Sequence, residues 1–292
     1  MTRISAQTTS TAWLDVIVTA LAPMIWGSTY IVTTQVLPPD RPFTAALIRV
    51  LPSGLLLLLY ARSRPARGDW ARLLTLSALN IGAFQALLFV AAYRLPGGLA
   101  AVVGAIQPLL VMGLAWGVDR RRPLMTTVWA AIAGVVGMGV LLLSPGTVFE
   151  PVGIAAALAG AACMAAGTYL TRRWRLSMPV LALTGWQLLL GGLMLTPVAL
   201  LADPPLPSLT GWQTAGYVYL SMAGALLAYA LWFRGIARLA PVAVSSLGLL
   251  SPLTAVVLGW VLLGQAIKGL AFVGLAMVFA SILAVQWTAS RT

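Results

Sequence analysis

Arg49 is the ionisable residue that lies deepest within a long apolar run of this sequence. A charged side chain at membrane depth is costly, so it is by default a candidate for function. In a functional interpretation, its fixed positive charge attracts the carboxylate of a substrate. In a structural interpretation, carbonyl groups at a helix end neutralise it, or its long side chain reaches back to the membrane surface. The sequence alone is compatible with both.

Most of the groups that enzymes and ion-driven pumps use are missing from the apolar segments. The chain has no histidine and one cysteine, Cys163. Its six acidic residues lie near the start of the first apolar segment or in connections: Asp15, Asp40, Asp69, Asp119, Glu150 and Asp203. Proton-driven pumps use a carboxylate or histidine inside the membrane, and hydrolases or metalloenzymes need an acid, a base or a ligand set. We therefore expect no catalytic residue, no metal and no cofactor, and transport that does not couple through a buried acid.

Composition assigns the chain to the integral membrane proteins. Of its 292 residues, 60% are hydrophobic and 8% are charged, with a mean hydropathy of +0.96. Soluble domains carry about 25% charged residues. The net charge of +12 would suggest nucleic acid as the partner of a soluble protein. In a membrane protein it concerns orientation instead, and we expect no nucleic-acid partner.

Ten apolar runs are long enough to span a bilayer, which takes about 20 residues each. They are predicted at 13–36, 43–61, 71–93, 97–117, 124–143, 152–171, 180–202, 211–233, 241–263 and 267–288. Fourteen Arg residues lie in the even-numbered connections and the termini, against three Arg or Lys in the odd-numbered ones. Because cytoplasmic loops are enriched in Arg and Lys, both termini are predicted to be cytoplasmic.

The two halves of the sequence repeat. An offset of 144 aligns residues 76–118 with 220–262, with 12 identities in 43 positions that include Ser77/Ser221, Arg94/Arg238 and Pro108/Pro252. An odd number of helices per repeat inserts the halves in opposite orientations, which is typical of secondary transporters. We predict an all-α polytopic membrane protein of ten transmembrane helices, arranged as two inverted five-helix repeats around a central cavity. Residues 1–12 would form a cytoplasmic tail, 13–145 the first repeat and 152–288 the second.

Polar residues at equivalent positions of both repeats are candidates to line that cavity, because the axis relating the repeats passes through it. The equivalent pairs are Tyr30/Tyr169, Arg49/Gln187, Gln85/Tyr229 and Gln107/Ser251, and further candidates on the same helices are Trp26, Asn80, Trp186, Ser245 and Ser246. The alternative is that these side chains only join helices, at about 0.6 kcal/mol for each hydrogen bond.

Two prolines and three glycines have expected roles in the helices. Pro108 and Pro252 remove a backbone hydrogen bond from the fourth and ninth helices, so we expect hinges there. Gly153, Gly160 and Gly167, seven residues apart, predict a face of the sixth helix that packs closely on another helix.

The chain resembles the drug/metabolite transporter superfamily with paired EamA modules. The matching features are Trp26-Gly27-Ser28, Arg49, the run through Pro108 and their counterparts in the second repeat, with Gln187 after Trp186. Within that superfamily it looks most like the YddG-type bacterial exporters, which implies aromatic and other amino acids as substrates and the bacterial inner membrane as location.

The leading hypothesis is therefore an amino-acid exporter that works by alternating access, in facilitated transport. We expect a monomer whose partners are the small-molecule substrate and membrane lipid. Alternatives are another small metabolite (a purine, a sugar derivative or a drug) and, in a different class, a channel. Saturable flux with counterflow would separate a carrier from a channel.

Overall fold

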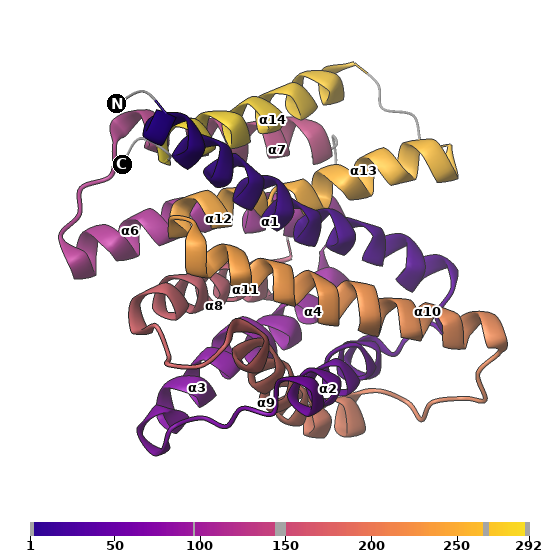
Figure 1. Cartoon of the computed structure of the whole chain (residues 1–292). Helices are drawn as coiled ribbons and strands as arrows, with labels where there is room; N and C mark the ends of the chain where they lie inside the picture. The colour runs from indigo at the N-terminus through magenta and orange to yellow at the C-terminus, as the bar shows by residue number, and fades with distance from the viewer. Residues whose placement is uncertain (1–2, 96, 144–149, 265–268, 290–292) are drawn as a thin grey trace.

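The computed structural model describes residues 3–95, 97–143, 150–264 and 269–289, which form helices and their connections (Figure 1). Ten helical stretches in this part are long and apolar enough to cross a membrane, which confirms the predicted number of spans. We number these spans in chain order. The first five contain α1 (Arg3–Gln35), α2 (Pro42–Ala61), η1 (Arg67–Asp69), α3 (Trp70–Ser77), η2 (Ala78–Gly82), α4 (Ala83–Arg94), α5 (Gly97–Gly104), α6 (Gln107–Asp119) and α7 (Met125–Leu142).

The second five spans repeat this order of elements. They contain α8 (Pro151–Trp174), α9 (Val180–Ala202), α10 (Gly211–Ser221), η3 (Met222–Leu227), α11 (Ala228–Arg238), α12 (Pro241–Leu247), α13 (Leu250–Leu263) and α14 (Leu270–Ala289). The third and eighth spans are each two α-helices joined by a π-helical segment. The fourth and ninth spans are each two shorter helices with a break between them.

Local sequence explains where several helices begin. Proline stands at the first turn of α2, α8 and α12, where its fixed φ suits the helix. The N–H that proline lacks would have no hydrogen-bond partner within the helix at this position. Glu150 caps α8 through a bond from the Gly153 backbone N–H to its side chain. Thr210 and Gln213 cap α10 reciprocally, each side chain accepting from the other residue's backbone N–H.

The two irregularities recur at equivalent places in the repeats. The π segments η2 and η3 begin at Ala78 and Met222, which the repeat offset of 144 relates. The breaks follow Gly104 in the fourth span and Leu247 in the ninth. Gln107 and Pro108 therefore open α6, and Ser251 and Pro252 lie in the first turn of α13. The breaks lie just before the two prolines expected to be hinges.

Each span packs mainly on spans of the other repeat. α2 packs along α9 and α7 along α14, while α4 packs on α8 as α11 packs on α1 (Figure 1). α8 also contacts α6 as α1 contacts α13. Every one of these pairs maps onto itself or onto another when the repeats are exchanged, as a pseudo-twofold axis in the membrane plane requires.

Glycines allow the closest of these approaches. A Cβ at Gly54 of α2 would lie 2.5 Å from the backbone nitrogen of Leu189 in α9. Gly192 follows Gln187 by five residues as Gly54 follows Arg49, and a Cβ there would lie 3.0 Å from Leu51 of α2. The predicted small-residue face of α8 is also confirmed. A Cβ at Gly153, Gly160 or Gly167 would meet residues of the third span or of the connection that follows it.

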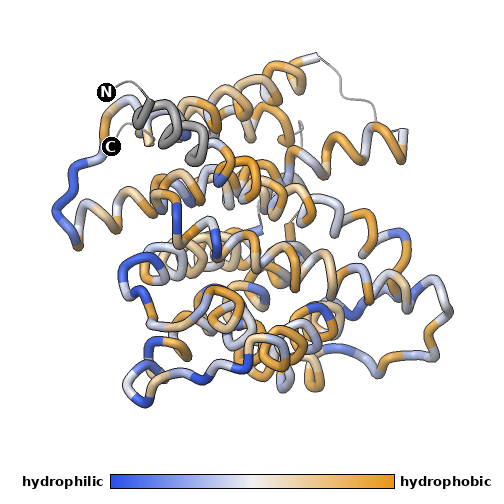
Figure 2. The backbone as a smooth tube through the Cα atoms, viewed as in Figure 1, coloured by the Kyte–Doolittle hydropathy of each residue, from blue (hydrophilic) through white to orange (hydrophobic). Residues whose placement is uncertain are grey.

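Charged residues gather at the ends of the spans. Both termini and the arginine-rich even connections lie at the left of Figure 1, and Figure 2 shows strongly hydrophilic stretches along the same edge. Two ion pairs occupy equivalent positions at opposite ends of the molecule. Arg238 lies 3.2 Å from Asp15, and its repeat equivalent Arg94 lies 3.4 Å from Glu150.

Candidate functional site

Gln85 and Tyr229 mark the centre of the molecule. The Gln85 Nε2 donates to the Tyr229 hydroxyl at 3.2 Å, and the two residues are 1% and 2% exposed. They are repeat equivalents, on α4 and α11. Two equivalent residues can touch only where the pseudo-twofold axis passes between them. The predicted pairing of these positions therefore corresponds to a direct contact on the axis.

Aromatic rings surround this contact. The Trp26 ring of α1 lies 5.0 Å from the Tyr229 ring and 5.1 Å from the Trp232 ring, both at tilted angles. Phe233 stacks on Tyr229 with centroids 6.0 Å apart. Such offsets suit the quadrupoles of the rings. The result is an apolar and aromatic wall from α1 and α11 at the axis.

Arg49 reaches the same wall from α2. Its side chain is 7% exposed, and its Nη2 donates to the Gly224 carbonyl in η3 at 2.9 Å. The Trp26 Nε1 donates to that same carbonyl at 3.0 Å. A π segment changes the hydrogen-bond register of a helix, and such bulges occur frequently at functional sites. In this conformation Arg49 therefore bonds to a backbone carbonyl, and that carbonyl belongs to a π segment inside a span rather than to a helix end.

Ser53, one turn after Arg49, strengthens the same junction. Its hydroxyl lies 2.6 Å from the Ser221 carbonyl and 2.8 Å from the Ser221 hydroxyl, just before η3. All three oxygens are buried, where a missing hydrogen bond would be costly. Arg49 and Ser53 together fix α2 to the start and middle of η3.

The equivalent junction in the other half is neutral. Asn80 in η2 is the repeat equivalent of Gly224, and it contacts Gln187, the repeat equivalent of Arg49, with Nδ2 2.7 Å from Oε1. Asn80 also donates to the Thr171 hydroxyl of α8 at 3.2 Å. Each π segment is thus held by one polar residue of the second or seventh span. One of these residues carries a charge and the other does not, so the centre is electrically asymmetric.

The two broken spans meet beside the axis. A Cβ at Gly248, in the break of the ninth span, would lie 3.9 Å from both Gln107 Oε1 and the Trp232 ring. Ser251 brings its carbonyl within 2.5 Å of where a Cβ on Gly27 would stand, so α13 crosses α1 closely. Ser245 and Ser246 donate to carbonyls one turn back in α12, and Gln286 of α14 donates to Ser246 at 3.0 Å.

Two of the cavity candidates lie away from this centre, near the helix ends on the side of the termini. The Tyr169 hydroxyl donates to Asp119 at 2.6 Å, and Arg173 contacts both residues. The Trp186 Nε1 donates to the Ser63 carbonyl at 3.0 Å, and its ring meets Trp70 edge-on at 5.2 Å. Tyr169 and Trp186 lie on α8 and α9, which continue past the centre. The sequence identifies the helix of each residue but not its distance from the site along that helix. The side chain of Tyr30, the equivalent of Tyr169, lies outside the described residues.

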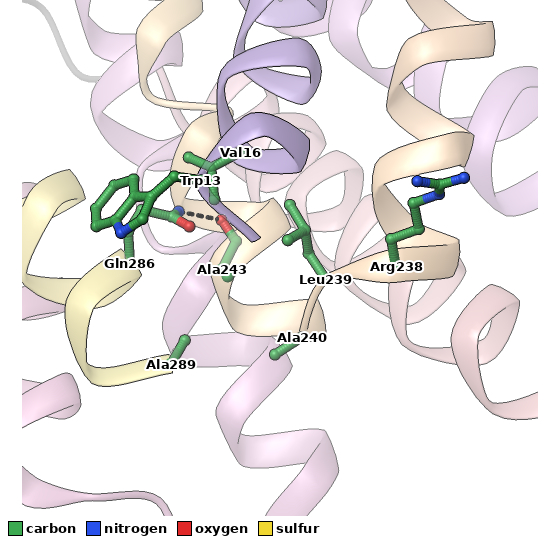
Figure 3. Close-up of a pocket in the computed structure, with 8 residues that line it drawn as sticks. All are labelled: Trp13, Val16, Arg238, Leu239, Ala240, Ala243, Gln286 and Ala289. Atoms are coloured by element: carbon green, nitrogen blue, oxygen red, sulfur yellow. Dashed lines mark hydrogen bonds between the residues drawn. The ribbon is translucent and has the colours of Figure 1, made fainter. Parts of the chain in front are cut away.

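A small pocket lies at that same end of the molecule, apart from the aromatic wall (Figure 3). It has a volume of about 160 Å³ and is bordered by α1, the connection before α12, and α14, with Trp13, Arg238 and Gln286 among its lining residues. Figure 3 shows Arg238 directed away from the other lining side chains. Gln286 is engaged there by the Ala243 carbonyl at 2.8 Å.

All six acidic residues lie in the described part of the chain, each in a connection or near the end of a membrane span. Asp15 pairs with Arg234 at 2.6 Å as well as with Arg238. Asp119, Glu150 and Asp203 accept hydrogen bonds there from Tyr169, Gly153 and Thr44. Within the described residues no three acidic, cysteine or histidine side chains gather to hold a metal ion. The centre offers a guanidinium, amides, a phenol and aromatic faces, which suit binding rather than bond-making chemistry.

Sequence analysis did not select several residues of this centre. Four of them contact candidates that it did select: Gly224, Ser53, Trp232 and Phe233. The fifth, Ser221, bonds to Ser53. A signal existed for two of them, since Ser77/Ser221 and Phe89/Phe233 are identities between the repeats. Gly224 acts through its carbonyl, which leaves no mark in the residue type.

Comparison with known proteins agrees with the fold. The model of the EamA-like transporter family matches twice, at residues 13–143 and 151–287. Protein PecM of Dickeya dadantii is 44% identical over 91% of this chain and 90% of its own. The uncharacterised inner membrane transporter YedA of Escherichia coli K12 is 30% identical over 81% and 78%. A crystal structure superposes with a TM-score of 0.80 over 95% of this chain and 98% of its own, at 20% identity, which shows the shared fold.

Proposed function

Because the chain belongs to the EamA-like transporter family, we propose that this membrane transporter exports amino acids, aromatic ones among them, from the bacterial cytoplasm by alternating access. The observation that carries the proposal is the buried Arg49 beside an aromatic wall. A guanidinium has five N–H donors, so it can hold the Gly224 carbonyl and still receive a carboxylate. Tyr229 is 2% exposed here, so a conformation that opens the centre would present the rings of Trp26 and Tyr229 to an apolar or aromatic side chain.

The proposed transport is facilitative. Proton coupling through the protein normally needs an acid or histidine in the membrane interior. The six acidic residues lie in connections or near the ends of the spans, and Asp15, near the start of the first span, is already paired with two arginines. Net flux would then follow the amino-acid gradient, and export would result from a high cytoplasmic concentration.

Location and assembly complete the proposal. The relative YedA is named an inner membrane transporter. The same membrane, with cytoplasmic termini, suits the positive-inside rule here. We propose a monomer in contact with lipid, since the helix pairs of the fold are formed within one chain. The mass of the purified protein in detergent tests this last point. Within the family, the resemblance to YddG-type exporters supports the choice of amino acids.

Uptake into proteoliposomes tests the proposal. Labelled phenylalanine and a non-aromatic amino acid are supplied with and without an imposed pH gradient, beside a purine and a sugar derivative. We expect saturable amino-acid uptake with counterflow and no response to the gradient. Uptake that collapses without the gradient contradicts facilitation, and flux that does not saturate indicates a channel. Uptake of only the purine or the sugar derivative moves the substrate to the alternative class.

Arg49→Gln tests the residue that carries the proposal. A hydrogen bond to a charged group contributes about 1.5–3 kcal/mol, so we expect amino-acid affinity to fall about ten- to a hundredfold. Arg64→Gln is the matched control, because Arg64 is exposed in the connection between α2 and η1. Equal affinities of the two variants, with wild-type levels of folded protein, would leave Arg49 as a structural residue only.

A further inference from the structure

The side-chain oxygen of Gln85 lies buried at the centre without a hydrogen-bond partner among the described residues. Its amide nitrogen is engaged by Tyr229, while Oε1 accepts nothing. A buried polar atom left unsatisfied costs about 1–3 kcal/mol. Such a cost at the pseudo-twofold axis suggests that the oxygen acquires a partner during the transport cycle.

A zwitterionic substrate would bring a suitable partner. An α-ammonium carries three N–H donors and needs oxygen acceptors or aromatic faces. The six acidic residues lie in connections or near the ends of the spans, so none of them stands at the centre to meet that charge. A neutral amide oxygen is the acceptor that the centre offers instead.

Gln85 is connected to the carboxylate end of the proposed site through one ring. Tyr229 joins Gln85 to Trp26, and Trp26 donates to the Gly224 carbonyl that Arg49 also contacts. The acceptor and the guanidinium are thus each linked to Trp26 through one intermediate group, the Tyr229 ring or the Gly224 carbonyl. A substrate that met both groups would lie beside these aromatic rings, whose faces attract an ammonium.

We propose that Gln85 Oε1 binds the α-ammonium group of the substrate and so selects amino acids over the corresponding carboxylic acids. The proposal rests on the proposed function, whose carboxylate partner is Arg49. It assigns the two charges of the zwitterion to residues of different helices, Arg49 on α2 and Gln85 on α4.

Asn80 is the other buried amide of the third span with a partnerless oxygen, and the geometry excludes it from this role. A Cβ on Gly167 would overlap the Asn80 Oδ1, so that oxygen rests against the α8 backbone. Its nitrogen is engaged by Gln187 and Thr171. Asn80 therefore fixes η2 to its neighbours, whereas Gln85 faces the aromatic centre.

The test compares phenylalanine with 3-phenylpropionate, which lacks only the amino group. Binding of each ligand to purified full-length protein is measured for wild type, Gln85→Met and Gln286→Met. Methionine keeps the length of glutamine and removes the acceptor. Gln286 is the control for losing a buried glutamine, because it lies 4% exposed at the far end of α14.

For Gln85→Met we expect phenylalanine affinity to fall at least tenfold and 3-phenylpropionate affinity to change less than twofold. Gln286→Met should leave the ratio of the two affinities unchanged. Equal losses for both ligands in Gln85→Met would overturn the inference and leave the amino-acid function standing. Wild-type protein that binds neither ligand would overturn the proposed function and this inference with it.

A second variant keeps the test valid if Gln85→Met fails to fold. Gln85→Glu adds a carboxylate of the same shape, so it should retain phenylalanine binding and gain binding of 2-phenylethylamine, the ligand without a carboxylate. Failure to gain the amine, in protein whose melting temperature matches wild type, would also overturn the inference.

Discussion

At the scale of single residues, the candidates for the site separate by their contacts rather than by their types. Arg49, Gln85, Trp26 and Tyr229 form one connected group at the pseudo-twofold axis. Tyr169 has the same residue type as Tyr229, yet its hydroxyl bonds to Asp119 near the helix ends. Repetition in the sequence identified the equivalent positions, and depth along each helix decides which of them can meet a substrate.

Tyr169→Phe tests this separation. The change removes a hydroxyl that bonds to Asp119 and accepts from Arg173 at 3.0 Å, so we expect the protein to lose about 1 kcal/mol of stability. The KM for amino acids should stay within twofold of wild type. A melting curve and an uptake assay measure the two effects, with Trp26→Phe as the contrasting change at the centre. A KM raised tenfold in Tyr169→Phe would place this residue in the substrate path.

At the scale of elements, four of the spans that reach the centre depart from regular α-helix. η2 and η3 interrupt the third and eighth spans, and breaks interrupt the fourth and ninth. The expectation that Pro108 and Pro252 remove a helical hydrogen bond is wrong, because both stand in the first turn after a break, where the backbone N–H has no helical partner to lose. Discontinuous helices beside a central site are typical of secondary transporters, whose halves rock about that site.

Pro108→Ala and Pro252→Ala test whether the breaks act as hinges. Alanine would let the shorter helices join into one, which should slow transport at least fivefold while folded yield falls less than twofold. Initial rates in proteoliposomes and yield after size-exclusion chromatography give the two numbers. Proportional losses of rate and yield would instead assign the prolines a structural role alone.

The sequence was sufficient for the broad architecture because that architecture depends on apolar composition and on the order of residues along the chain. Apolar length gave ten spans, arginine positions gave their alternation, and the 144-residue offset gave the inverted repeat. The π segments could not be predicted this way, since a change of hydrogen-bond register at Ala78 or Met222 needs no special residue. The bond from Arg49 to Gly224 depends on that register, so the sequence could indicate the cation but not its partner.

At the scale of the whole molecule, the two repeats interlock. α2 lies on α9, α7 on α14, and the first and sixth spans each pack on two spans of the other repeat. Rocking of one half against the other must therefore change contacts along several spans at once. The ion pairs Arg238–Asp15 and Arg94–Glu150 hold equivalent places at opposite ends of this interface.

Orientation of the whole chain is open to direct measurement. With Cys163 replaced by serine, single cysteines are placed at Arg121, in an even connection, and at Leu206, in an odd one. Because the even connections carry the excess of arginine, a membrane-impermeant thiol reagent should label residue 206 in intact spheroplasts and residue 121 only after lysis. The reverse pattern would invert the proposed topology.

The contact of Gln85 with Tyr229 has a historical consequence. Gln85 and Tyr229 occupy equivalent positions of the two repeats, so in this history they descend from one position of a single five-helix chain. Before the halves were fused, that position would have touched its own copy in an antiparallel pair of identical chains. Such a chain had to insert in both directions, which a strong arginine bias on one side forbids. The bias of fourteen to three would then have arisen only after fusion fixed each half in its direction. The same event would have freed one copy to become a glutamine and the other a tyrosine, so that a symmetric frame came to carry two unlike side chains at its axis.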